Sequence, residues 1–386
     1  MKHTSSAQLF KNIRFKILLA FIIFPVWIVK AQTIQPDKVH VGFIYPLSTN
    51  GTHAPADTNS FSMHVLAGVS AQENGLAFAG LTNVVRNDLN GLGFAGFSNH
   101  IFKKANGLLF AGFMNTYGSA KGFQFAGFSN VASKDVEGAQ FAGFSNIAQN
   151  VNGSQFAGFV NVAKNSKGSQ FAGFGNVTNK HVGGSQFAGF INVADTVKGF
   201  QFAGFINIAK KVKGGQFAGF INIADSSDCP VGLINLIKNG EKSIAVTVDE
   251  NQTSLISFRS GGKILYGILG LGYNFKNSDA IYAFEAGLGA HFFNTEPFRL
   301  NAELAATYLE GFGYGEYLKS SIRFLPAITL GKRLEIFAGP SFNFITTNTL
   351  EGEMLNKHYL TKRQNRYSDY FQAVYIGYTG GLNIKF

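Results

Sequence analysis

Apolar residues recur every 15 or 16 positions between Leu76 and Ala224. The segment repeats the pattern Gly-x-Gln-Phe-Ala-Gly-Phe-x-Asn-Val/Ile-Ala, and alignment on the first Phe gives positions 78, 94, 110, 125, 141, 156, 171, 187, 202 and 217. A second Phe ladder from Phe97 to Phe220 and an Asn ladder from Asn83 to Asn222 keep the same period. Each apolar stretch is too short and too rich in Gly for a helix, and a polar turn follows it. The spacing therefore predicts a series of short β-repeats.

Repeats of this size must stack, because one unit cannot bury its own aromatic side chains and its neighbours must share a core with it. If each unit forms one coil of a β-solenoid, equivalent residues lie about 4.8 Å apart. We then expect Phe to stack on Phe, and Asn side chains to hydrogen-bond along a ladder. Representative ladder positions are Phe125, Asn130, Phe141, Asn146, Phe156, Asn161, Phe187 and Asn192.

A rival geometry would make each repeat a lipid-facing strand of a transmembrane barrel. Such strands need about 9 to 11 residues of regular alternation. The two Phe residues of a unit are three positions apart, which places them on opposite faces of a straight strand. A bend between them, as in a solenoid, is the simpler solution.

Strict alternation of apolar and polar residues replaces the repeats after about residue 237. Apolar Tyr282, Phe284 and Phe292 share one face of a segment whose other face carries Glu285 and His291. Such segments are long enough to cross a membrane as tilted strands. The sequence predicts an antiparallel β-barrel of roughly eight strands, at about 242–249, 252–259, 263–275, 280–293, 297–309, 316–331, 334–347 and 371–386.

The connections between these strands alternate in length, as they do in outer-membrane barrels. Tight turns are expected at 259–262, 294–296 and 331–333, and the longest and most charged connection is 348–370. Short connections are typical of periplasmic turns and long ones of outer loops. Small and polar residues on the inner face predict a narrow, filled lumen. The alternative is a soluble β-sandwich or lipocalin-like barrel, whose outer face would be polar.

Residues 1–31 carry a basic start, an apolar run from Ile17 to Val29 and a short polar end. About 13 apolar residues are too few to span a bilayer, so the segment reads as a secretory signal peptide, with a retained anchor as the alternative. The predicted organisation is a signal peptide at 1–31, an N-terminal cap of the repeat domain at 32–75, the β-repeat domain at 76–236 and the barrel at 237–386. The fold class is all-β.

The formal charge of +11 changes little in this interpretation. Five of these positive charges lie in the first 31 residues with no acid among them, which leaves +6 for the remainder. The remaining basic residues are dispersed, and this indicates a solvated surface rather than a nucleic-acid partner. The single cysteine, Cys229, cannot form a disulfide within the chain.

The sequence contains no recognisable catalytic, cofactor or metal motif. The eight histidines are scattered, and neither a zinc motif, a nucleophile elbow nor a phosphate-binding loop is present. We therefore expect no enzyme, no catalytic residue, no cofactor and no metal. Glu285, His291, Arg299 and Glu303 all fall on the predicted inner face of the barrel. A polar network that plugs the lumen is the favoured interpretation, and a lumen enzyme or a small-ligand gate is the alternative.

The Asn ladder of the repeats also has two interpretations, one as a ligand-binding site and one as a structural feature. Its amides could bind a flat ligand or a glycan, but hydrogen bonding within the solenoid explains the ladder without a ligand.

The final segment resembles the last strand of bacterial outer-membrane proteins. It reads Tyr-Ile-Gly-Tyr-Thr-Gly-Gly-Leu-Asn-Ile-Lys-Phe and closes on an aromatic residue. That resemblance implies recognition by the barrel-assembly machinery through Phe386, with Ile384 and Leu382 on the same face. It covers about 145 residues and implies outer-membrane lipid as the partner of the barrel.

The repeats, with Val-Gly-Phe-Ile-Tyr-Pro-Leu-Ser-Thr-Asn-Gly at 41–51 and Phe61 to Gly68, are similar to the surface repeat-containing proteins of Bacteroidetes and spirochaetes. The match covers roughly residues 38–236. It implies a location at the cell surface and no established activity. An even-stranded barrel entered from the periplasm would instead leave the repeats in the periplasm. The sequence is therefore compatible with repeats on either side of the membrane.

Taken as a whole, the sequence predicts a non-catalytic outer-membrane or cell-surface protein. The barrel is expected to be an anchor, and the repeats a binding or spacer surface for an unknown envelope or host ligand. The alternative is a small outer-membrane channel or solute gate that the repeats cap.

Overall fold

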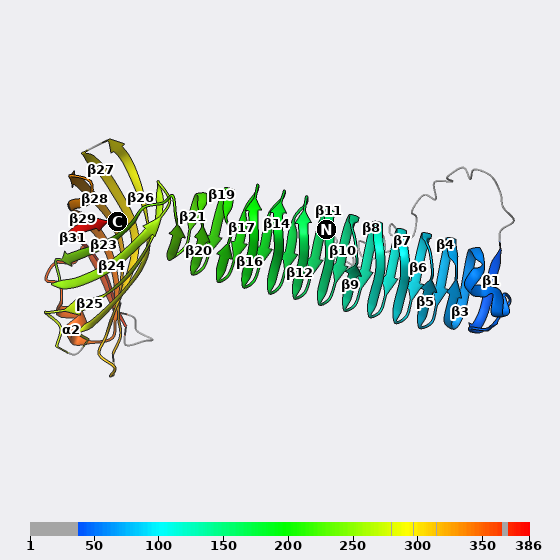
Figure 1. Ribbon diagram of the computed structural model, residues 1–386. Coiled ribbons are helices and arrows are strands. Elements are labelled where there is room, and N and C mark those ends of the chain that lie inside the picture. The colour runs from blue at the N-terminus through cyan, green and yellow to red at the C-terminus, as the bar shows by residue number, and fades with distance from the viewer. Residues whose placement is uncertain (1–37, 279, 296, 314, 365–369) are drawn as a thin grey trace, which may run out of the picture. The chain divides into compact units, whose positions relative to one another are not determined.

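The computed structural model describes residues 38–386 except 279, 296, 314 and 365–369. The signal peptide predicted at 1–31 lies outside the described residues. The described chain is nearly all β, with 73% of its residues in strands. Its strands form two sheets, one of parallel stacked coils and one closed into a barrel (Figure 1). The predicted fold class is therefore confirmed.

The solenoid sheet contains 22 strands among the described residues. Their bounds are β1 Val39–Ile44, β2 Leu47–Ser48, β3 Thr58–Ser70, β4 Gln72–Ala79, β5 Thr82–Val85, β6 Leu89–Ala95, β7 Ser98–Ala111, β8 Met114–Ala126, β9 Ser129–Ala132, β10 Val136–Ala142, β11 Ser145–Ala157, β12 Val160–Ser166, β13 Gln170–Ala172, β14 Gly175–Val182, β15 Gln186–Ala188, β16 Ile191–Val197, β17 Gln201–Ala203, β18 Ile206–Ile208, β19 Lys211–Ala218, β20 Ile221–Ala224, β21 Ser226–Val231 and β22 Ile234–Ile237. A 3-10 helix, Gly51–Ala56, lies between β2 and β3.

Neighbouring coils pair in parallel and in the register that the repeat period predicts. In the pairing of β10 with β11, Gln140 lies opposite Gln155 and Phe141 opposite Phe156. Equivalent positions therefore form continuous ladders along the coils. The segment before the recognisable repeats joins the same stack, because β3 pairs in parallel with β1, β4 and β5.

Hydrogen-bonded amides, rather than phenyl rings, fill the centre of the solenoid. The Asn146 Nδ2 donates to the Asn161 Oδ1 at 3.0 Å and to the Phe156 carbonyl at 2.8 Å. A parallel Gln ladder runs beside it, where Gln155 Nε2 donates to Gln140 Oε1 at 2.8 Å. These amide side chains are fully buried. Small apolar residues such as Ala148 complete the core.

The Phe ladders stack as predicted, but they lie on the outside of the coils. The rings of Phe141 and Phe156 are 4.8 Å apart and nearly parallel. Rings of the second ladder, such as Phe144 and Phe159, are 40% and 41% exposed. The expectation that the aromatic residues form the shared core was wrong. In a β-strand, residues two apart share a face, so Gln, Ala and Asn occupy the narrow interior and leave the intervening Phe outside.

Glycine allows neighbouring coils to approach closely within paired strands, as at Gly138 in β10. Gly138 has a φ of 128°, a conformation that side-chain-bearing residues rarely adopt. A Cβ atom built there would lie 1.9 Å from the carbonyl oxygen of Gly122 in the preceding coil. The Gly of the repeat is therefore a requirement of backbone packing at this position.

The second sheet closes on itself as an eight-stranded antiparallel barrel. Its strands are β23 Lys242–Asp249, β24 Thr253–Gly261, β25 Leu265–Asn274, β26 Tyr282–Thr295, β27 Phe298–Glu310, β28 Tyr317–Leu330, β29 Leu334–Thr347 and β31 Phe371–Lys385. Each pairs with its neighbour, and β23 pairs with β31 to close the ring. Every predicted strand is present within two residues of its expected ends.

The connection 348–370 contains two short elements. They are the helix α2 Leu350–Met354 and the strand β30 Thr361–Gln364, which extends the sheet beside β31. The side chain of Thr349 caps α2 by accepting a hydrogen bond from the Gly352 amide. None of the helices in the described part of the chain is long and apolar enough to cross a membrane.

The barrel has an apolar outer face and a polar inner face. On β23, Ile244, Val246 and Val248 point outward and are 45–49% exposed, whereas Ser243 and Thr247 are 2% exposed. The same alternation holds across the barrel, with Leu304 and Ile376 among the outward residues. This inside-out pattern is opposite to that of a soluble sandwich or lipocalin-like barrel, whose outer face is polar.

Candidate functional site

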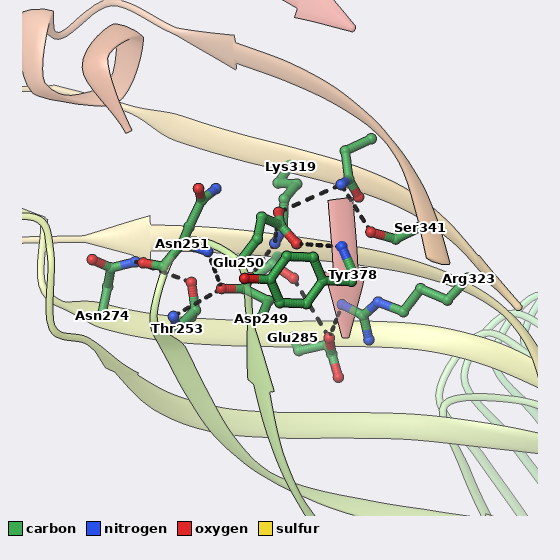
Figure 2. A network of polar contacts seen from close by, with 12 residues as sticks. Asp249, Glu250, Asn251, Thr253, Asn274, Glu285, Lys319, Arg323, Ser341 and Tyr378 are labelled. Carbon is green, nitrogen blue, oxygen red and sulfur yellow. Dashed lines mark hydrogen bonds and ion pairs between the residues drawn. The ribbon is translucent and has the colours of Figure 1, made fainter. Parts of the chain in front are cut away.

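The barrel lumen holds a dense network of charged side chains, contributed by different strands (Figure 2). Arg323 on β28 pairs with Glu285 on β26 and lies 3.6 Å from Glu303 on β27. Glu303 is also paired with Arg259 on β24 at 3.0 Å. All four of these side chains are at least 96% buried. Ionised groups buried this deeply require partners, and each finds one across the barrel.

A second group of charges lies around Arg299 on β27. Its guanidinium contacts Glu241 at 2.9 Å and Glu335 on β29 at 2.7 Å. His291 Nδ1 hydrogen-bonds to Asn301 Oδ1 at 2.7 Å, and Asn301 Nδ2 donates to Glu335 at 3.1 Å. His291 therefore belongs to the network through its hydrogen bond to Asn301.

A third group occupies the part of the lumen drawn in Figure 2. Lys319 on β28 pairs with Asp249 at the end of β23 and lies 3.8 Å from Glu250. The Tyr375 hydroxyl donates to Glu250 Oε1 at 2.8 Å. The Asp249 Oδ1 also accepts the backbone amides of Asn251 and Thr253 at the β23–β24 turn. This group fixes the turn to the barrel wall.

All four predicted lumen residues face inward, but they belong to two separate groups of contacts. Glu285 and Glu303 join through Arg323, whereas His291 and Arg299 meet around Glu335. Tyr266 connects the two groups, because its ring stacks on His291 at 4.4 Å and its hydroxyl donates to Glu303 at 2.8 Å.

Sequence reasoning missed most of the partners in this network. They are Asp249, Glu250, Arg259, Lys319, Arg323 and Glu335. The alternation that predicts the strands also places these residues on the inner face, except Glu250, which follows the end of β23. The period-two alternation is therefore the sequence signal for the inward position of the residues within strands, but it does not show which of them pair.

The lumen network leaves almost no free volume near His291 and Arg299. A void lined by Glu241, Tyr266, His291 and their neighbours measures about 10 Å³. That is about the smallest volume able to hold one water molecule. Acidic and basic side chains neutralise each other within the network. The arrangement thus suits a structural plug better than a conduit or a substrate pocket.

A second buried polar cluster lies in the first coils, outside the predicted sites. His40 Nε2 lies 3.3 Å from His64 Nε2 and 2.9 Å from Ser48 Oγ. Ser62 Oγ donates to Glu73 at 2.7 Å, and Asn59 connects Glu73 to His40. Burial, and next the neighbouring His40, lowers the pKa of His64 to about 4, so the imidazole is neutral at physiological pH.

The cluster in the first coils contains two imidazoles and one carboxylate, those of His40, His64 and Glu73. Among residues 38–386 with their few gaps, no group of three or more His, Cys, Asp or Glu side chains is spaced to hold a metal ion. A site with only two imidazoles lacks the third protein ligand of a typical catalytic zinc. The cluster pairs most of the polar groups at the start of the stack, but the His64 Nδ1 atom is buried without a hydrogen-bond partner.

The outer face of the repeats carries a long apolar groove. It has a volume of about 1400 Å³ and follows the first Phe ladder from Phe78 to Phe217. Its lining consists of Phe, Ala and Gly from ten consecutive coils, with Val231 at one end. A separate groove over residues 104–198 is polar and is lined by Lys, Asn, Asp and Glu among others. The predicted Phe ladder is thus part of an exposed surface, whereas the predicted Asn ladder is inaccessible.

The residues expected to carry the barrel-assembly signal lie on the outer face of β31 or directly after it. Leu382, Ile384 and Phe386 are 47%, 56% and 70% exposed. Their recognition by the assembly machinery stays a prediction.

A scan of family models, a search of curated proteins and a search of solved structures each found no match to this chain. The resemblance of the repeats to surface repeat-containing proteins therefore stays a prediction, and the function must be argued from the geometry.

Proposed function

We propose that this protein is a non-catalytic outer-membrane protein in which the barrel is the anchor and the repeats are an interaction surface. The observation that supports the anchor is the apolar outer face of the barrel. Residues from every side of the ring contribute, including Ile256, Leu304, Ile328 and Ile376, which are 44–65% exposed. In water this surface would be costly to leave uncovered, whereas lipid covers it.

The geometry of the strands agrees with a membrane location. The barrel strands β26 to β29 and β31 have 13 to 15 residues each, which is enough for a tilted strand to cross the hydrocarbon core. Closure by β23 and β31 leaves no unpaired edge in the ring, as a bilayer requires.

The filled lumen supports an anchor over a channel. Ion pairs between buried side chains link four strands of the wall, through Arg259 on β24, Glu285 on β26, Glu303 on β27 and Arg323 on β28. A solute pathway would need these ion pairs to separate, at the cost of leaving buried charges unpaired. The same network disfavours catalysis, because each carboxylate already has a cationic partner.

Membrane fractionation combined with heat-modifiability tests this proposal. The full-length chain should be found in the outer-membrane fraction, and its unboiled form should migrate faster than its boiled form in a detergent gel. Recovery in the soluble fraction without a mobility shift would rule out the anchor. A fragment covering residues 237–386 should show the same shift if the barrel folds without the repeats.

A further inference from the structure

The second Phe ladder presents a continuous apolar ridge along the solenoid. Its rings from Phe97 to Phe205 are 37–50% exposed, although they stack on one another. A Phe side chain has about 200 Å² of surface, so each ring exposes about 80 Å². Eight rings therefore expose on the order of 600 Å², as much as the largest apolar patch of a typical monomer.

The first ladder and its groove add further apolar surface to the same coils. Each unit carries both rings, separated only by Ala and Gly, for example Phe156 and Phe159 around Ala157 and Gly158. With both ladders, the apolar area exceeds the roughly 800 Å² per partner that a specific protein interface buries. An exposed apolar surface of this size is typical of a site that binds a partner.

The chemistry of this surface restricts the partner. The groove presents no charged or hydrogen-bonding side chain, and the amides of its strands already pair with adjacent coils. A polar ligand or an added β-strand would therefore find no hydrogen-bonding partners. Phenyl rings recur every 4.8 Å, so the best-matched partner presents apolar side chains at the same spacing.

We propose that a second copy of this chain covers the Phe ladders. A second copy offers a ridge and a groove with the same 4.8 Å period, so every coil of one can meet a coil of the other in register. Two-fold symmetry makes such an interface self-complementary. This inference rests on the proposed role of the repeats as an interaction surface, but not on the location of the barrel.

Site-directed crosslinking in isolated membranes or lysate, before detergent is added, tests the inference. Phe159 is the middle ring of the second ladder, so two copies place it near its counterpart whether the rods run parallel or antiparallel. The Phe159→Cys variant, in a Cys229→Ser background, should form a covalent dimer with a short bis-maleimide. The matched control Lys167→Cys lies on the polar groove and should stay monomeric.

Charge substitutions provide the second measurement. Phe128→Lys and Phe159→Lys combined, two coils apart, should reduce the dimer fraction at least tenfold relative to Lys167→Glu combined with Lys198→Glu. Retained heat-modifiability and β-sheet circular dichroism would show that the variant is folded. Absence of a crosslink at position 159, or equal dimer fractions in both variants, would overturn the proposal. A monomer in the outer membrane would overturn only this inference, whereas a crosslinked soluble dimer would overturn only the anchor.

Discussion

Arg323 illustrates how a single residue supports the filled barrel. Its guanidinium lies between Glu285 and Glu303, and all three side chains are at least 98% buried. Removing it would leave two carboxylates with fewer cations in a region without bulk water.

We expect Arg323→Ala to destabilise the barrel by about 3–5 kcal/mol, because it leaves buried charge unpaired. Guanidinium unfolding in detergent micelles measures this change. Glu285→Leu combined with Arg323→Met is the matched control and should be less destabilising than Arg323→Ala alone. Equal stability of Arg323→Ala and the unmodified protein would mean that the lumen is hydrated.

Asn146 tests the amide core of the solenoid. It donates to Asn161 and to the Phe156 carbonyl and accepts from Asn130. Asn146→Ala leaves these buried groups without a partner, which should cost about 1–3 kcal/mol. Asn150→Ala, on the exposed Asn row, should cost much less. If denaturant titration gives similar losses of unfolding free energy at the two positions, the buried Asn ladder does not stabilise the solenoid more than the exposed Asn row does.

His64 gives the first coils a defined pH dependence. The pKa of its imidazole is about 4 in the folded chain and 6.5 in the unfolded chain, so between these values only the unfolded chain binds the proton. This contribution to stability is complete above pH 6.5 and is lost as the pH falls toward 4. The lowered pKa of His40 acts in the same direction, and the burial-raised pKa of Glu73 acts against it.

We therefore expect hydrogen exchange in β1, β3 and β4, corrected for intrinsic rates, to lose protection between pH 7 and pH 4.5. The His64→Gln variant should lose less protection over the same interval. If protection is constant or rises on acidification, Glu73 dominates the cluster and the assignment to His64 is wrong.

At the scale of elements, the sequence is sufficient to predict the eight strands of the barrel. Period-two alternation sets both the bounds and the inward face of a strand, so Glu285 and His291 were correctly placed. The partners of Glu285 lie on strands that are distant in sequence, and single-strand patterns carry no information about pairing across a lumen. The 15- or 16-residue period likewise predicted coil stacking and ring stacking.

The repeat period alone does not show whether a ladder lies inside or outside the coil. Burial of aromatic side chains is the usual expectation, but in the repeats the Gln and Asn ladders occupy the interior, where Tyr117 is a buried aromatic ring that accepts a hydrogen bond from Gln140. Gln140 and Asn146 are fully buried, whereas Phe144 is 40% exposed. In the alternation Gln-Phe-Ala, a buried Gln implies that the Phe beside it faces outward.

A whole coil should be removable without disturbing the ladders. Deleting residues 141–155 joins Ala139-Gln140 to Phe156 and preserves every register of the parallel pairing. We expect this variant to retain β-sheet circular dichroism and protease resistance. Deleting residues 141–148 shifts the ladders by half a unit and should expose the solenoid to proteolysis. Equal resistance of both deletions would show that the coils do not depend on register.

At the scale of the whole molecule, the filled lumen predicts that the barrel does not conduct ions. Reconstituted into planar bilayers, the full-length chain should give no conductance above the lipid baseline at neutral pH, because ion pairs such as Arg259 with Glu303 close the lumen. The heat-modifiable, folded fraction of the same preparation is the control for correct insertion. Stable unitary currents would favour the channel interpretation instead.

The most direct test of the membrane anchor is the depth dependence of an outward-facing arginine. Leu304 lies at the middle of β27 and is 59% exposed, and Leu330 is the last residue of β28 and is 49% exposed. In lipid vesicles we expect Leu304→Arg to cost about 2–4 kcal/mol of folding free energy and Leu330→Arg about 0–1 kcal/mol. Negligible costs at both positions, with folding in the absence of lipid, would contradict the anchor.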